Sequence, residues 1–160
     1  DLAITQAGKE YRLREALQLD YDYCIIDTPP ALGIITINAL AASNEAVIVA
    51  QADVFSLQGI GALSATLQAV KQSANPQLTI NGILITRHNP RTIISRDMLQ
   101  LLEDTARHLG TRVYDARIRE ATAVKEAQAM QTDLFSYSPQ NNAAQDYNAF
   151  IGELLEGHNE

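Results

Sequence analysis

An aspartate followed by two prolines is the stretch of the sequence whose residue types best suit chemistry. Asp27 comes directly after the apolar run 23–26, Pro29 and Pro30 follow it, and Gly33 lies three residues further on. Because ligands bind beyond the carboxyl ends of parallel strands, a carboxylate at this position can hold hydrated Mg²⁺ through a water. The prolines fix φ and remove two N–H donors, and Gly33 frees the loop, so the pattern predicts a stiff switch segment. A structural alternative is an aspartate that ends the strand and caps the following helix.

Alternating apolar runs and helical patterns predict the elements that position this segment. Continuous apolar runs with β-branched residues favour strands that are buried on both faces of a parallel sheet. The predicted strands lie at residues 23–26, 46–50, 80–86 and 113–114. Apolar residues at helical spacing predict helices at residues 9–17, 57–70 with Ser56 as N-cap, 94–109 and 143–155. The order predicts an α/β fold, a parallel β-sheet with flanking helices joined by βαβ crossovers.

Composition narrows the class of protein. The chain has 160 residues, 46% of them hydrophobic, which suits one globular domain over residues 1–160. Its apolar runs are shorter than the roughly 18 residues of a membrane span, and we expect no secretion signal. The single cysteine, Cys24, lies in an apolar run, so we expect a small core residue in a reduced, cytoplasmic protein. The net charge of −7 argues against nucleic-acid binding by the chain as a whole.

Several separated segments resemble the ParA family of partition ATPases, which includes the MinD relatives. In order and register, the matching segments are IIDTPP (25–30), TINALAA (36–42), QAD (51–53), LQG (57–59), GILIT (82–86), IR (118–119) and KEA (125–127). The resemblance covers about residues 11–155 and implies a partial P-loop NTPase fold of the ParA/MinD type. It also implies that Asp27 is the Walker B aspartate, which binds Mg²⁺ through water. Pro29, Pro30 and Gly33 would then begin switch II.

Two motifs of the ParA family have no counterpart in the sequence. The family's Gly-rich P-loop, KGGxGKT, holds the phosphates with backbone N–H groups and a lysine. Gly8-Lys9 has no upstream glycine and no following Ser or Thr, and the D-x-D-P-Q motif of switch I is absent. We therefore expect the C-terminal part of a ParA-like ATPase without the P-loop and switch I region. The intact protein would use ATP and Mg²⁺, whereas this chain alone would be inactive and bind neither tightly.

The resemblance also implies contacts with the nucleotide base. In the family, the loop that matches Thr86 and Arg87 lies near the adenine, as does the loop that matches Ile118 and Arg119. These four residues are therefore candidates for nucleotide binding. The alternative is that they form strand-to-helix connections with solvated side chains.

Binding to DNA is the second contact that the resemblance implies. The family's non-specific DNA surface uses a basic residue just before a Thr, which matches Arg91. Arg96 and Lys125 are further candidates, but Ala123 aligns with the family's second arginine. Residues 87–119 hold more basic than acidic side chains while the rest of the chain is acidic, which points to an anionic partner on one face. Ordinary scatter of charge on a solvated surface is the alternative.

Three functions are consistent with these patterns. The first is a ParA-type ATPase that segregates or positions plasmid, mobile-element or chromosomal DNA, as a nucleoid-associated homodimer with a ParB-type adaptor protein. The second is a MinD-like positioning ATPase, although the acidic last helix, with Asp146, Glu153 and Glu156, disfavours an anionic membrane as partner. The third is a P-loop-free relative that only binds a partner and catalyses nothing.

Overall fold

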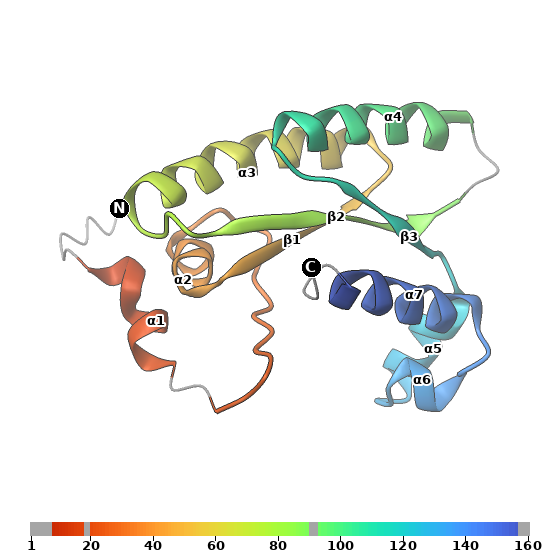
Figure 1. Ribbon diagram of the computed structural model, residues 1–160. Coiled ribbons are helices and arrows are strands. Elements are labelled where there is room, and N and C mark those ends of the chain that lie inside the picture. Colours follow the sequence, from red (N-terminus) through yellow and green to blue (C-terminus); the bar gives the residue numbers. More distant parts are fainter. Residues whose placement is uncertain (1–7, 18–19, 90–92, 157–160) are drawn as a thin grey trace. The chain divides into compact units, whose positions relative to one another are not determined.

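The structure is a computed structural model that describes residues 8–17, 20–89 and 93–156, with the backbone alone of residues 93–96 (Figure 1). The elements, in chain order, are η1 (Lys9–Tyr11), α1 (Arg12–Ala16), α2 (Ile34–Ala42), β1 (Glu45–Gln51), α3 (Val54–Ser73), β2 (Thr79–His88), α4 (Ile93–His108), β3 (Val113–Arg119), α5 (Thr122–Ala129), α6 (Leu134–Tyr137) and α7 (Asn142–Glu156).

The described strands form one sheet in the order β1–β2–β3 (Figure 1). Strands β2 and β3 are parallel, with Ile83 opposite Val113 and His88 opposite Arg119. A parallel pair needs a crossover, and α4 supplies it between β2 and β3. The prediction of an α/β fold with a parallel sheet and flanking helices is confirmed.

The chain divides into two compact units, Asp1–Ala46 with Ile60–Thr79 and Val47–Gly59 with Ile80–Glu160. In the first unit, η1 and α1 pack against α2. The buried side chain of Asn75 closes the end of α2, because its Nδ2 donates to Leu40 O at 3.0 Å and to Ser43 O at 2.7 Å. These bonds satisfy carbonyl groups that the end of a helix leaves without an internal partner.

Tyr114 is the centre of the core in the second unit. Its side chain is fully buried, and its ring packs edge-to-face against Phe150 of α7 with the ring centroids 4.9 Å apart. Its hydroxyl donates to Asn81 Oδ1, which ties β3 to β2. The adjacent Gly82 leaves room for this ring, and Arg112 lies 5.0 Å from the ring centroid. One aromatic residue thus holds β2, β3 and α7 together.

The prediction of a buried first strand at residues 23–26 is wrong. These residues have no regular secondary structure and belong to no strand of the described sheet, and Ile25 is 94% exposed. Cys24 is exposed as well, so the prediction that it is a core residue is also wrong. A strand needs hydrogen-bonded neighbours and an apolar cover. In the described part of the chain, this segment lies outside the sheet and the Ile25 side chain is not covered.

The turn from β1 into α3 differs from the prediction in its cap. Ser56 does not cap the helix, because α3 already begins at Val54. Instead, Asp53 Oδ1 accepts a hydrogen bond from Ser56 N at 2.7 Å, and Ser56 Oγ accepts one from Gln51 N at 3.0 Å. Asp53 therefore does the capping, as an aspartate at this position can.

Candidate functional site

Asp27 lies in the first unit, in a segment without regular secondary structure, and its side chain is exposed. Pro29 and Pro30 are exposed too, and Gly33 is the residue directly before α2. Gly33 has φ −106° and ψ −170°, an extended conformation that any residue adopts. The structure thus places the predicted switch segment on the path into α2 and exposes its carboxylate.

Two hydrogen bonds fix the turn that follows the prolines. The carbonyl of Ala31 accepts from Gly33 N at 2.9 Å and from Thr36 Oγ1 at 2.7 Å. Thr36 is buried in α2, so this side chain anchors the turn to the helix. The backbone behind Asp27 is therefore held from both sides, by proline rings before the turn and by α2 after it.

Asp27 alone does not make a metal site. The part of the chain that the structure describes contains no group of three or more His, Cys, Asp or Glu side chains that could hold a metal ion. Magnesium needs six ligands and keeps several waters, so a single carboxylate binds it only when a phosphate or other oxygen ligands complete the shell. The described residues by themselves therefore do not fit a resident Mg²⁺.

The four residues predicted to contact a base lie together in the second unit. Thr86, Arg87, Ile118 and Arg119 line one open pocket of about 130 Å³. The pocket lies where β2 and β3 end and is completed by the start of α5 and by α7. Its other lining residues are Glu120, Ala121, Val124, Lys125 and Tyr147. The resemblance implied that these residues belong to two loops near the base, whereas in the structure they lie at the ends of β2 and β3 and line one cavity.

Toward this pocket, the hydroxyl of Thr86 can only accept a hydrogen bond. Its Oγ1 donates its proton to the carbonyl of Ala50 on β1 at a distance of 3.3 Å. A hydroxyl has one donor and two acceptor positions, so the remaining capacity of Thr86 is that of an acceptor. A ligand group that donates a hydrogen bond fits here, and one that only accepts does not.

The rim of the pocket carries a small network of charges. Arg87 Nη2 lies 3.2 Å from Glu120 Oε1, and Lys125 Nζ lies 3.7 Å from the same oxygen. Arg87 has φ +50°, in the left-handed region that is uncommon for residues other than glycine. This residue coincides with the irregular register of β2 and β3 between Ile85 and His88, and its side chain reaches Glu120 after β3. The rim keeps one positive charge in excess, which suits an anionic ligand.

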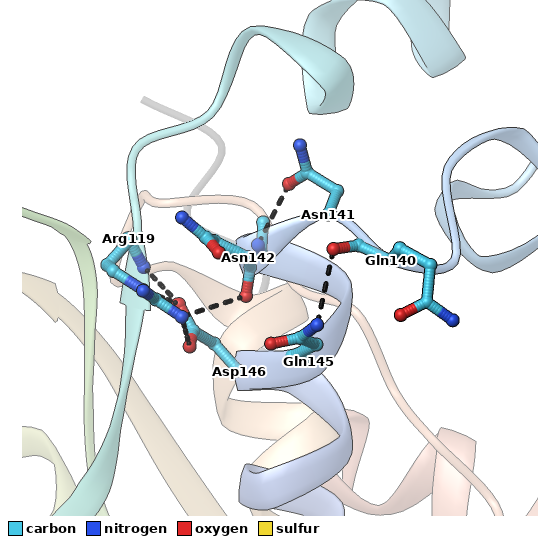
Figure 2. Close-up of polar contacts among 7 residues, drawn as sticks. Arg119, Gln140, Asn141, Asn142, Gln145 and Asp146 are labelled. Carbon is cyan, nitrogen blue, oxygen red and sulfur yellow. Dashed lines mark hydrogen bonds and ion pairs between the residues drawn. The ribbon is translucent and has the colours of Figure 1, made fainter.

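Arg119 is committed to Asp146 of α7 rather than open to a ligand (Figure 2). Its Nη2 lies 2.6 Å from Asp146 Oδ1, and its Nε and its backbone N lie 2.8 Å and 2.9 Å from Oδ2. Nη2 also donates to Asn142 O at 3.4 Å. Burial would raise the pKa of Asp146, but the hydrogen bonds and charge of Arg119, with His88, lower it below its usual value. Arg119 therefore lines the pocket with its guanidinium already bound.

His88 and Arg117 lie beside this ion pair, at the ends of β2 and β3. Burial and the charge of Arg117 lower the pKa of His88, and the charge of Asp146 only partly opposes them. Within the described part of the chain, His88 Nδ1 and Arg117 Nε are buried without a hydrogen-bond partner. The neutral form of His88 is therefore favoured next to Arg117.

The predicted DNA-binding residues are only partly placed. Arg91 lies outside the described residues, and Arg96 lies in α4, where the structure gives the backbone but not this side chain. Lys125 is exposed and pairs with Glu120 on the rim of the pocket, whereas Ala123 is buried. None of the described helices is both long and apolar enough to cross a membrane.

The sequence did not predict that Glu120 and Tyr147 line the pocket, nor that Asp146 binds Arg119. Asp146 and Glu153 were noticed only as acidic residues of the last helix. Their spacing of seven residues places them on one face, which was the available signal. The partner of each carboxylate lies 27 or more positions away in the sequence, so spacing alone could not identify it.

Comparison with known proteins places the chain in a family. A family model described as an AAA domain matches residues 2–80. The chain is 32% identical over 155 residues to the chromosome partitioning protein ParA of Myxococcus xanthus. This match covers 95% of the chain and 54% of that protein. It is 34% identical over 143 residues to the sporulation initiation inhibitor protein Soj of Bacillus subtilis, covering 88% of the chain and 55% of Soj.

A solved structure resembles the chain over nearly its whole length. The cobyrinic acid a,c-diamide synthase of Mycobacterium smegmatis, with bound ADP and magnesium, matches with a TM-score of 0.75 and 30% identity. The match covers 98% of this chain and 56% of that one. The chain spans about half the length of the curated relatives it matches. With these relatives and this fold, the chain belongs to the ParA family of partition ATPases.

Proposed function

We propose that this chain is the C-terminal part of a ParA-type ATPase, whose hydrolysis of ATP segregates or positions DNA. The observation that carries the proposal is the pocket, because Thr86, Arg87, Ile118 and Arg119 come from the ends of two strands, β2 and β3, and line one cavity. A cavity at the carboxyl ends of parallel strands is where ligands bind in α/β folds. The family membership supplies the class of ligand, a nucleotide.

The chemistry of the pocket favours adenine over guanine. Thr86 Oγ1 can only accept there, and the N6 amino group of adenine donates where the O6 of guanine accepts. Ile118, Val124 and Tyr147 supply apolar surface against which a planar base can pack. The excess positive charge of the rim would attract the phosphates.

Asp27 would supply the contact with magnesium. It would hold a water of Mg²⁺ bound between the phosphates, and the prolines behind it would keep the carboxylate in place. The phosphates of the bound nucleotide and a hydroxyl from a P-loop, a motif that this sequence does not contain, would have to complete the shell. The ADP and magnesium bound to the Mycobacterium smegmatis protein support this combination of ligands.

The proposed partners follow from the same family. A nucleoid-associated homodimer with bound ATP would bind DNA without sequence preference through Arg91, Arg96 and Lys125, and a ParB-type adaptor would stimulate hydrolysis. The name of the Myxococcus xanthus relative, a chromosome partitioning protein, supports DNA as the cargo. DNA binding of this kind would weaken steeply with salt, because each phosphate contact releases counterions.

Nucleotide binding by the protein in its full natural length tests the proposal. We expect affinity for ATP that depends on Mg²⁺ and exceeds the affinity for GTP. Asp27→Ala should lower ATP turnover about 10- to 100-fold, the usual effect of removing an outer contact of a metal. Absence of Mg²⁺-dependent ATP binding would leave the P-loop-free, partner-binding relative as the better description.

The preference for adenine has its own test with a matched control. Thr86→Val keeps the shape but removes the acceptor, so the ratio of ATP to GTP affinity should fall about 10-fold. Thr111 makes a comparable bond away from the pocket, since its Oγ1 donates to Ile80 O at 2.7 Å. Thr111→Val should therefore leave the ratio unchanged. An equal ratio in both variants would show that Thr86 does not read the base.

A further inference from the structure

The outer edge of β3 is closed by carboxylates of α7 rather than by another strand. Glu153 Oε1 accepts from Asp115 N at 3.1 Å, and its Oε2 accepts from Ala116 N at 3.0 Å. Asp146 Oδ2 accepts from Arg119 N at 2.9 Å. A strand at the edge of a sheet leaves backbone N–H groups without a partner, and side-chain acceptors can satisfy them. Two residues of one helix thus do the same task at opposite ends of β3.

Asp146 differs from Glu153 in what lies beside it. Asp146 contacts Arg119, which lines the pocket, and the next residue of α7, Tyr147, lines it too. Glu153 contacts Asp115, Ala116 and Arg112, and none of these is a lining residue of the pocket. The two carboxylates are alike in their role on β3 but differ in their relation to the pocket.

The corner between β3 and α5 forms much of the pocket wall. Residues of this corner that line the cavity are Ile118, Arg119, Glu120, Ala121, Val124 and Lys125. Ala121 at the start of α5 makes no side-chain cap, and Glu120 is held on the exposed rim by Arg87 and Lys125. The corner is tied to α7 by Asp146, which binds the backbone N, Nε and Nη2 of Arg119 at once. A paired fork of this kind fixes orientation as well as distance.

We propose that Asp146 is a positioning residue for the nucleotide, which holds the Arg119–Val124 corner in the shape that the base requires. This inference rests on the proposed function, because it takes the pocket as the site of the base. Asp146 would not touch the ligand. It acts through Arg119, whose guanidinium is tied back to α7 and whose backbone and stem then form the wall.

The test compares Asp146→Asn with Glu153→Gln in the protein of full natural length, with ADP and Mg²⁺ as the probe. In both variants, an amide replaces a carboxylate that accepts hydrogen bonds from the backbone of β3. Both should therefore lower the urea concentration at the midpoint of unfolding. Only Asp146→Asn should also weaken ADP binding, about 10-fold, whereas Glu153→Gln should stay within about twofold of the wild type. Asp146→Glu keeps the carboxylate and should recover part of the lost affinity, which also serves if Asp146→Asn does not fold.

Amide hydrogen exchange without nucleotide separates failure of this inference from failure of the proposed function. Asp146→Asn should speed exchange at residues 119–124, and Glu153→Gln should speed it only near residues 115–116. If the wild type binds no ADP, the proposed function fails, and exchange alone decides whether Asp146 holds the corner. Equal ADP affinity in the two variants, or unchanged exchange at residues 119–124 in Asp146→Asn, overturns the inference.

Discussion

Gly82 on β2 lies directly against the ring of Tyr114 on β3. A Cβ atom on Gly82 would lie 2.5 Å from Tyr114 Cε2 and 2.8 Å from Cζ, closer than atoms in proteins pack. The ring cannot move away, because Phe150 packs against it and its hydroxyl is bonded to Asn81. The approach of β2 to β3 therefore depends on the absence of a side chain at position 82.

Gly82→Ala should destabilise the protein by about 2–3 kcal/mol, the usual size of a steric insertion into a packed core. The midpoint of urea unfolding measures the loss. Gly152→Ala is the control, because a Cβ at this position of α7 would meet nothing within 4 Å. It should raise stability by about 0.5–1 kcal/mol, since alanine favours a helix more than glycine does. Equal midpoints for the two variants would contradict the packing described here.

Asn75→Ala should destabilise the first unit by about 1–3 kcal/mol. The change leaves the carbonyl groups of Leu40 and Ser43 without their donor in a buried site, and an unpaired buried polar group carries a penalty of that size. Gln72→Ala, at an exposed position of α3, is the control and should change stability by less than about 0.5 kcal/mol. Thermal unfolding monitored by circular dichroism compares them. A neutral Asn75→Ala would mean that water replaces its bonds.

Stability should rise as the pH increases through the usual pKa of histidine, about 6.5, because of His88. The folded state lowers the pKa of His88, so near this pH the unfolded state binds more protons and acid favours unfolding. Asp146 has a lowered pKa, so its stabilisation is present above the usual pKa of an aspartate, about 4, and is lost only in stronger acid. Urea unfolding at several pH values should therefore show a slope that His88→Gln removes.

The control for this slope is His108→Gln, on the exposed last turn of α4. This variant should retain the wild-type pH dependence around the usual pKa of histidine. The groups that act on His88 come from two neighbouring elements, Arg117 from β3 and Asp146 from α7. An unchanged slope in His88→Gln would assign the pH dependence to another group.

Ile25→Ser should leave the stability of the 160-residue chain within about 0.5 kcal/mol of the wild type, because the side chain is 94% exposed. In the protein of full natural length, we expect the same change to cost about 2–5 kcal/mol, as for an aliphatic side chain in a core. Urea unfolding of both lengths gives the comparison. The same small effect in both would contradict the expectation that Ile25 is buried in the protein of full natural length.

Hydrophobic spacing predicted most of the elements because it reports burial within the chain itself. The helix predicted at 94–109 is α4, the helix predicted at 143–155 is α7, and the run at 80–86 is β2. In each case, the apolar side chains pack against another element of the same chain. The run at 23–26 is also apolar, yet it lies outside the described sheet and Ile25 is 94% exposed, which composition cannot reveal.

The sequence could predict where the residues of the candidate site lie along the chain, but not which side chains they contact. Thr86 was predicted at the end of a strand, whereas the resemblance placed Ile118 in a loop. Both lie near the carboxyl ends of parallel strands, which meet at one edge of the sheet. The pairing of Arg119 with Asp146 could not be predicted, because it depends on how α7 crosses β3 rather than on any local pattern. Likewise, the donor role of Thr86 toward Ala50 appears only once β1 lies next to β2.

The carboxylates of α7 decide in which direction this sheet can grow. An incoming strand must find free amide donors as well as acceptors, and along β3 the donors of Asp115, Ala116 and Arg119 are already engaged. At the opposite border, β1 ends the described order and exposes Val49. Any further strand would therefore pair with the β1 edge of the sheet. The engaged donors of β3 disfavour edge-to-edge pairing of two copies through β3.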